Sequence, residues 1–197
     1  MTNVLTDLID ELAALFEAER KPGGDEAAAA LRRHRDDPVH HAGTTTELDA
    51  EIRAMCAEPD AIPAARRVEA AWDVLPWHFS GLSDGRIPEH VARRMITCEV
   101  IGSRGAIDCG TCRIGLFAQA PGVDYPIRTH AAEETFFMLA GRGDWRRAGE
   151  DWRALGPGEH SHHPSMIEHQ SRTAERGFLA AWRWTGDIGL ESYLFRG

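Results

Sequence analysis

The stretch "DYPIRTHAAEETFFMLAGRG", residues 124–143, decides the fold of this chain. It contains His130 and Glu134, four positions apart, followed by an apolar run that ends at Gly141. Side chains at positions i and i+4 of a strand point to the same face of its sheet. A mixed set of imidazole and carboxylate ligands suits iron, manganese, zinc or nickel. The spacing therefore predicts a strand that presents half of a metal site to the interior of a barrel.

A second unusual segment is "LGPGEHSHHPSMIEHQSRT", residues 155–173, which is rich in histidine. Pro157 and Gly158 predict a tight turn, "HSHH" a short strand, and the following "PS" a bend. His169 comes after this bend. Among the histidines of the short strand, His163 directly precedes the bend and is the one most favoured to reach the site.

From about Trp77 onward, glycine and proline become frequent and short apolar runs alternate with turn signals. Short strands at this spacing are typical of an all-β sandwich or barrel. We expect strands at "ITCEVIG", "RIGLFAQ", "ETFFMLAG", "GDWRRA", "DWRALG", "GFLAAWRW" and "ESYLFR".

The first part of the chain, residues 2–75, is predicted to be mostly helical. Apolar residues recur at three- and four-residue spacing near the N-terminus, as on one face of an amphipathic helix. Asp25 is placed to cap a second helix, Thr45 or Thr46 a third, and Pro63 lies in the first turn of a fourth. This part contains no chemical motif. We therefore divide the chain into a helical region, 1–76, and a barrel domain, 77–197, and expect the helices to pack on the barrel or on the second subunit of a homodimer.

The composition excludes several classes of partner. The 197-residue chain has a net charge of −9, which disfavours nucleic acids and anionic membrane surfaces. No apolar run approaches the ~20 residues that span a bilayer, and the N-terminus has acids where a secretory signal has an apolar block. These features predict a cytoplasmic protein. The lone "CGTC", residues 109–112, is interpreted as a turn between strands with two reduced thiols.

The two histidine-containing segments resemble the motifs of the cupin superfamily, whose members fold as a small jelly-roll barrel with a metal inside. The first cupin motif falls on Gly122, His130, Glu134 and Gly141. The second motif, a Pro-Gly turn followed by a histidine ligand, falls on Pro157, Gly158 and His169. Both motifs occur in order on a β-rich segment. The resemblance implies a mainly β fold, a cupin β-barrel preceded by several helices.

More closely, the chain resembles the bacterial cupin lyases that cleave dimethylsulfoniopropionate, which also have a helical N-terminal half. The resemblance implies that Tyr125 is the catalytic tyrosine. It implies that His130, Glu134 and His169 bind a divalent transition metal, namely iron, zinc, manganese or nickel. It also implies a small-molecule carboxylate as the substrate.

Two positions depart from the lyase pattern. Arg128 stands where a further motif histidine is expected, and Phe136 where a second tyrosine is expected. Arginine does not ligate metals because it stays protonated. If Arg128 points inward, its charge either repels the metal ion and weakens metal binding, or forms a bidentate interaction with the carboxylate of the substrate. If it points outward, it is a solvated strand residue.

The reaction implied by the resemblance is a β-elimination that releases dimethyl sulfide and leaves acrylate. An aromatic side chain would receive the sulfonium group by cation–π contact, worth about 0.5–2 kcal/mol. The expected substrate-binding residues are Arg128, Phe136, Trp145, Trp182, Trp184 and His163.

Two other classes of function remain open from the sequence. One is a cupin without lyase activity that binds or senses a small ligand. The other is a cupin dioxygenase or isomerase that uses the same metal for different chemistry. The helical half favours the lyase, whereas Arg128 and Phe136 favour divergence from it.

Overall fold

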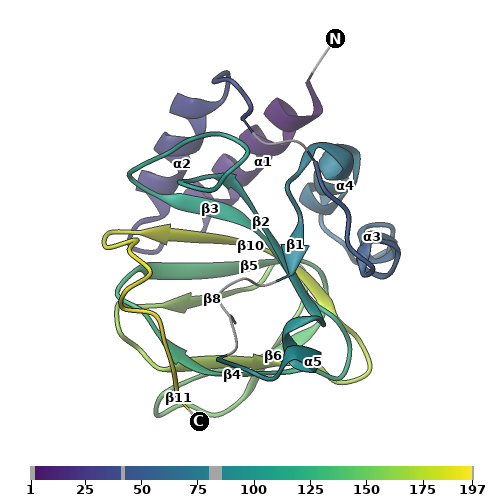
Figure 1. Cartoon of the computed structure of the whole chain (residues 1–197), viewed down its shortest axis with the longest axis vertical. Helices are drawn as coiled ribbons and strands as arrows, with labels where there is room; N and C mark the ends of the chain where they lie inside the picture. Colours follow the sequence, from purple (N-terminus) through teal and green to yellow (C-terminus); the bar gives the residue numbers. More distant parts are fainter. Residues whose placement is uncertain (1–2, 41–42, 80–85, 197) are drawn as a thin grey trace.

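The computed structural model describes residues 3–40, 43–79 and 86–196, and it shows two antiparallel sheets with helices on one side (Figure 1). The helices are α1 Val4–Ala18, α2 Gly24–His34, α3 Asp49–Cys56, α4 Pro63–Ala71, the 3-10 turn η1 Trp72–Val74 and α5 Glu89–Ala92. The strands of the first half of the barrel are β1 His78–Phe79, β2 Met95–Ile101, β3 Arg113–Gln119, β4 Asp124–Thr129, β5 Glu133–Gly141 and β6 Gly143–Arg147. The others are β7 Arg153–Leu155, β8 His160–His163, β9 His169–Arg172, β10 Phe178–Thr185 and β11 Leu194–Arg196.

The strands form a six-stranded sheet, in the order β1-β2-β3-β10-β5-β8, and a five-stranded sheet, in the order β11-β4-β9-β6-β7. The predicted mainly β fold with helices at its N-terminal end is confirmed. The eight expected strands, the short strand at "HSHH" included, correspond to β2, β3, β5, β6, β7, β8, β10 and β11. Strands β1, β4 and β9 were not among them. Strand β9, "HQSR", has no apolar pattern and is defined by its pairing with β4 and β6.

Strands β5 and β10 lie side by side in the middle of the six-stranded sheet and are buried on both faces. Phe136 of β5 and Trp182 of β10 point into the barrel, where they join the inner hydrophobic cluster. The alternate residues Phe137 and Leu179 join the cluster beneath the helices. Burial on both faces explains why these strands are nearly continuous apolar runs rather than alternating ones.

Two motif glycines occupy positions that other residues would strain. Gly141 ends β5 with a φ of 73°, and a Cβ atom there would lie 2.2 Å from the carbonyl oxygen of Gly177. Gly158 has a φ of 87° in the turn that leads into β8. Glycine adopts such left-handed conformations at little cost. The cupin motif glycines therefore shape the turns that bring β5 and β8 together.

Helices α1–α4 pack over the outer face of the six-stranded sheet and share one buried cluster with it, whereas Ala92 of α5 joins the cluster inside the barrel. Helix α1 buries the apolar face predicted from its periodicity, and Pro63 is in the first turn of α4 as expected. The predicted caps were wrong: Gly23 precedes α2, which puts Asp25 in the first turn, and Leu48 precedes α3. The boundary between residues 76 and 77 stays a prediction.

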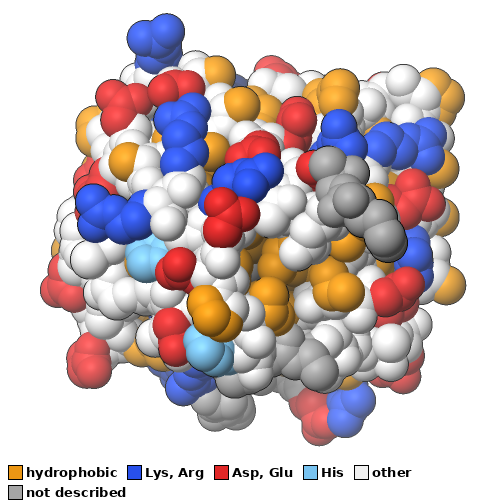
Figure 2. All heavy atoms as spheres, turned by 90° about the horizontal axis from the view of Figure 1, so that it is seen from above, with side chains coloured by type: hydrophobic (Ala, Val, Ile, Leu, Met, Phe, Trp, Pro, Cys, Tyr) orange, Lys and Arg blue, Asp and Glu red, His pale blue; other side chains and the backbone are white. Residues whose placement is uncertain are grey.

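None of the described helices is long and apolar enough to cross a membrane. Acidic and basic side chains are interspersed on the face of the molecule shown in Figure 2. The "CGTC" segment forms a turn before β3, as predicted, with Cys109 and Cys112 both free and buried.

A buried ion pair joins the helical layer to the barrel. Arg183 of β10 is fully buried and binds the carboxylate of Glu19, which directly follows α1, and the carbonyl oxygen of Pro22. Burial raises the pKa of Glu19, although the charge of Arg183 and its hydrogen bond oppose the shift. Removing one partner of such a pair leaves an uncompensated buried charge, which is more costly than losing both.

We predict that Arg183→Met lowers the free energy of unfolding by about 3–5 kcal/mol, because Glu19 is left buried without its partner. The double variant Glu19→Gln/Arg183→Met should recover part of this loss. As a control, Arg176→Met removes an exposed partner of Glu58 and should cost at most about 1 kcal/mol. Urea denaturation measures all three; equal costs for Arg183→Met and Arg176→Met would contradict the role of the buried pair.

Candidate functional site

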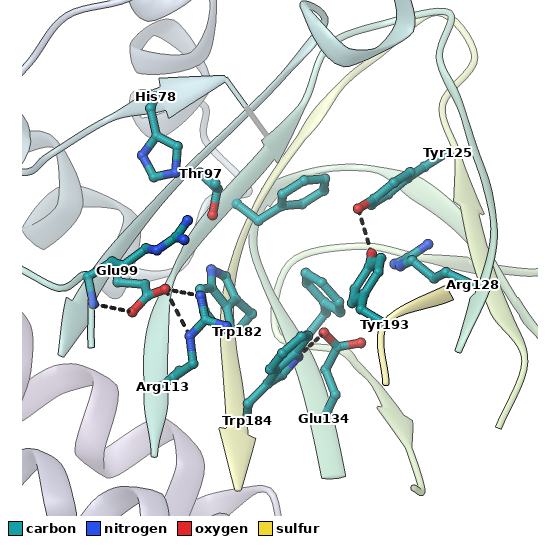
Figure 3. Close-up of a pocket in the computed structure, with 13 residues that line it drawn as sticks. His78, Thr97, Glu99, Arg113, Tyr125, Arg128, Glu134, Trp182, Trp184 and Tyr193 are labelled. Atoms are coloured by element: carbon teal, nitrogen blue, oxygen red, sulfur yellow. Dashed lines mark hydrogen bonds and ion pairs between the residues drawn. The ribbon is translucent and has the colours of Figure 1, made fainter. Parts of the chain in front are cut away.

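A cavity between the two sheets runs from an exposed end to a buried end (Figure 3). His78 and Arg104 lie at the exposed end, whereas Arg128, Glu134 and Tyr193 form the buried end. Its volume of about 70 Å³ leaves room for a handful of water-sized groups, so it suits a small ligand. The complete lining consists of His78, Thr97, Glu99, Arg104, Arg113, Phe117, Tyr125, Arg128, Glu134, Phe136, Trp182, Trp184 and Tyr193.

Three of the predicted metal ligands meet at the buried end. One ligand atom from each of His130, Glu134 and His169 lies within 4.8 Å of the others. The Nε2 atoms of His130 and His169 lie 3.3 and 3.1 Å from Oε2 of Glu134. All three side chains are at most 4% exposed.

The orientation of the two imidazoles fits a metal better than it fits hydrogen bonds. Nδ1 of His130 donates to the carbonyl oxygen of Ala132, and Nδ1 of His169 donates to that of Ile167, each at 3.0 Å. A carbonyl only accepts, so each Nε2 carries a lone pair and is free to ligate. Both Nε2 atoms are buried and have no hydrogen-bond partner in the described parts of the chain, despite their closeness to Glu134. A divalent cation bound among the three side chains would satisfy both.

Glu134 is held in place by two neighbours. Nε1 of Trp184 donates to Oε1 at 2.6 Å, and Nδ1 of His163 donates to Oε2 at 2.8 Å. Burial opposes ionisation of Glu134, but the adjacent imidazoles of His130, His163 and His169 outweigh it and keep the pKa well below the ordinary value. The carboxylate is therefore ionised and oriented before any metal binds.

The neighbouring histidines are neutral at pH 7. Burial lowers the pKa of His163 to about 4, against the opposing effect of Glu134. Burial, together with the charges of His163 and Arg128, keeps the pKa of His169 well below its ordinary value. Metal binding requires neutral imidazole, so this environment favours it at neutral pH.

One detail of the sequence prediction was wrong: His130 and Glu134 do not share a strand. His130 lies in the turn after β4, and Glu134 is the second residue of β5. The turn bends the chain so that the two side chains still converge at the meeting point of the sheets. His169 opens β9, opposite Arg128 of β4, and Glu134 lies opposite His163 of β8.

Arg128 points into the cavity. It is 1% exposed, and its guanidinium carbon lies 3.9 Å from the ring centre of Tyr125. In a regular strand, residues three apart face opposite sides, but the register of β4 against β9 shifts between Tyr125 and Arg128. This bulge explains why both side chains line the same cavity.

Tyr193 is the residue at the buried end of the cavity that the sequence did not predict; His78, Thr97, Glu99, Arg104, Arg113 and Phe117 also line the cavity without having been predicted. The hydroxyl of Tyr193 lies 2.8 Å from that of Tyr125, and its ring stacks on His130. Burial, followed by the effect of Tyr125, raises the pKa of Tyr193 well above its ordinary value, so Tyr193 stays protonated and can donate to Tyr125. The only feature of the sequence that could have drawn attention to Tyr193 is that the chain contains just two tyrosines, Tyr125 and Tyr193.

The other predicted substrate contacts divide into two groups. Phe136, Trp182 and Trp184 line the cavity. Trp145 and His163 are buried next to it but are not among its lining residues: Trp145 packs on the ring of Phe136 at 4.7 Å. His163 instead acts on Glu134, with Nε2 hydrogen-bonded to Ser161 at 2.8 Å.

Comparison with known proteins identifies relatives of this chain. The family profile for dimethylsulfoniopropionate lyases matches residues 25–180, more than half of the chain. The dimethylsulfoniopropionate lyase DddQ of Ruegeria pomeroyi is 37% identical over 119 residues, which cover 60% of this chain and 59% of DddQ. The putative dimethylsulfoniopropionate lyase DddL of Cereibacter sphaeroides is 30% identical over 205 residues, which cover 92% of this chain and 84% of DddL.

Solved structures support the same relationship. The crystal structure of DddQ from R. pomeroyi superimposes with a TM-score of 0.69 at 26% identity, over 96% of each chain. A cupin-2 domain from Rhodospirillum rubrum superimposes with a TM-score of 0.50 at 14% identity, over 64% of this chain and 78% of the domain. The match to the cupin-2 domain shows a shared fold and nothing more. The two structural matches together confirm the predicted cupin barrel.

The first prediction from this geometry concerns metal binding. His130→Ala, Glu134→Ala and His169→Ala should each lower the affinity for a divalent transition metal at least tenfold, because each removes one of three ligand atoms. His162→Ala is the matched control, since that ring pairs with Glu133 rather than with Glu134. Elemental analysis after dialysis against metal measures the bound ion. Equal metal content in all four variants would contradict the assignment.

The second prediction concerns pH. The pKa of His163 is about 4 in the fold and near 6.5 when unfolded, so the unfolded chain binds more protons between these values. The metal-free protein should therefore lose stability as pH falls from 6.5 toward 4, and the lowered pKa of Glu134 extends the loss to lower pH. Melting temperatures across this range measure the effect. His163→Gln should flatten the slope; an unchanged slope in that variant would show that the titrating group lies elsewhere.

Proposed function

This chain belongs to the dimethylsulfoniopropionate lyase family, and we propose that it is a metal-dependent carbon–sulfur lyase that converts dimethylsulfoniopropionate to dimethyl sulfide and acrylate. The observation that carries the proposal is a His-Glu-His ligand set whose Glu134 lines the same small cavity as Tyr125. The aligned part of this chain spans 59% of the length of DddQ.

The ligands of the metal would be His130, Glu134 and His169. Two neutral imidazoles and one carboxylate leave coordination positions open, as in catalytic rather than structural metal sites. This donor set suits iron, zinc, manganese or nickel. A divalent metal bound there would supply Lewis-acid stabilisation of the negative charge that develops on the substrate during proton removal.

Tyr125 is proposed as the base. Tyr125 lines the cavity, and its hydroxyl lies 2.8 Å from that of Tyr193, which can donate to it and leave a lone pair for the substrate. As the phenolate, Tyr125 would take the proton from the carbon next to the carboxylate. The electron pair of that C–H bond becomes the new carbon–carbon double bond, and the electron pair of the C–S bond leaves with dimethyl sulfide.

The aromatic lining suits the sulfonium end of the substrate. Phe117, Phe136 and Trp182 line the cavity. Nε1 of Trp182 donates to the carbonyl oxygen of Leu116 at 3.1 Å, which fixes the plane of the indole. A fixed aromatic face attracts a desolvated cation. Trp182 is therefore the proposed sulfonium contact, in addition to Phe136 and Trp184.

The test is release of dimethyl sulfide from dimethylsulfoniopropionate by the protein loaded in turn with iron, manganese, zinc or nickel. We predict activity with at least one metal, and loss of at least 100-fold of it in Tyr125→Phe with metal content unchanged, since the base is removed and the ligands are not. Gas chromatography measures the sulfide.

The matched control is Phe195→Leu, which removes an aromatic neighbour of Tyr125 that does not line the cavity. This variant should keep most of the activity. A metal-loaded protein that releases no sulfide with any of the four metals would contradict the lyase proposal and favour a cupin that binds a small ligand without cleaving it.

A further inference from the structure

Arg128 carries a buried positive charge that the proposed chemistry does not require. Its side chain is 1% exposed, and the terminal nitrogens Nη1 and Nη2 are both buried without a hydrogen-bond partner among the residues that the structure describes. A guanidinium does not lose its proton at ordinary pH, so it cannot escape the cost of burial by becoming neutral. The aromatic contacts of Arg128 offset part of this cost, but Nη1 and Nη2 would be satisfied by an anion brought from outside.

The acidic residues of the cavity are already engaged. Oε1 and Oε2 of Glu134 accept from Trp184 and His163. Glu99, nearer the exposed end, accepts from Arg113 at 2.9 Å. Neither carboxylate lies within ion-pair distance of Arg128 in the described structure. The charge of Arg128 is therefore left for a ligand.

The position of Arg128 limits what that ligand can be. The ring of Tyr125 covers one face of the guanidinium at 3.9 Å, and the ring of Phe136 lies 5.9 Å away. Stacking on Tyr125 does not use the terminal nitrogens, so Nη1 and Nη2 keep their N–H groups for a ligand. These two nitrogens match the two oxygens of a carboxylate, which forms two parallel hydrogen bonds with a guanidinium.

The neighbours of Arg128 define how such a ligand would be oriented. Arg128 lies opposite the metal ligand His169 in the β4–β9 register, and Tyr125 packs on the guanidinium itself. An acid held here has its carboxylate between the ligand set and the proposed base, and the rest of the molecule extends toward Trp182 (Figure 3).

We propose that Arg128 binds the carboxylate of the substrate bidentately, so that this cavity is a receptor for small carboxylates even before a metal is bound. The arginine thus takes over, by charge and hydrogen bonding, part of the carboxylate binding that a metal would otherwise provide. The inference rests on the proposed function for the small carboxylate as the ligand. The metal-free protein is therefore the right material for its test.

The experiment titrates protein freed of metal with a chelator, at pH 7.5, with propionate, with the neutral isostere propionamide, and with sodium chloride at matched ionic strength. Isothermal titration calorimetry measures binding, and the fluorescence of Trp182 and Trp184 at the cavity wall provides an independent readout. We expect propionate to bind at least tenfold more tightly than propionamide or chloride.

The variants are Arg128→Met, Arg128→Lys and the control Arg142→Met, whose side chain is exposed and does not line the cavity. Arg128→Met should weaken propionate binding at least tenfold. Arg128→Lys should be intermediate because lysine keeps the charge but cannot form two parallel hydrogen bonds. Arg142→Met should bind within twofold of the wild type. Arg128→Met should also melt at a higher temperature than the wild type without ligand, because it removes an uncompensated buried charge.

Three results would overturn the inference: propionate and propionamide binding equally, chloride binding as well as propionate, or Arg128→Met retaining wild-type affinity. Failure of the lyase proposal is a separate result. If the metal-loaded protein releases no dimethyl sulfide but the metal-free protein binds propionate through Arg128, the carboxylate receptor stands and its reaction is a different one.

Discussion

The buried carboxylate of Glu134 is the group on which the arrangement of the barrel interior depends. It lies in the six-stranded sheet and faces His130 and His169, which the turn after β4 and the start of β9 bring from the other sheet. A carboxylate this deeply buried is costly unless its oxygens are satisfied, and Trp184 and His163 satisfy them without occupying the two free imidazole nitrogens. The hydrogen-bond network therefore leaves one place, between the sheets, where a cation completes the site.

The chemistry of the site was more predictable from the sequence than its geometry was. Residue types and spacing predicted His130, Glu134 and His169 as metal ligands, and the structure brings them together. The pattern of short apolar runs between turn signals predicted most strands. The pairing of β4 with β9 was not predictable, because neither strand has an apolar alternation that specifies a register. Tyr193 was not predictable either, since its contact with Tyr125 joins residues 68 positions apart in the chain.

The orientation of Arg128 shows how one local irregularity decides function. Without the shift in register between Tyr125 and Arg128, one of these side chains would face the interior and the other the outside. The bulge directs both side chains inward and places the positive charge of Arg128 next to the predicted metal ligands. This charge lowers the affinity of the buried end of the cavity for a cation and raises its affinity for an anionic acid. Binding of a carboxylate, as proposed, would compensate this buried charge.

The central claim is that a metal bound by His130, Glu134 and His169 occupies the buried end of the cavity. The measurement that tests it most directly is anomalous diffraction from crystals of the metal-loaded protein. The account predicts a single strong peak ~2.0–2.2 Å from Nε2 of both histidines and from an oxygen of Glu134. A peak at another site, or no peak there in crystals that contain metal, would contradict it.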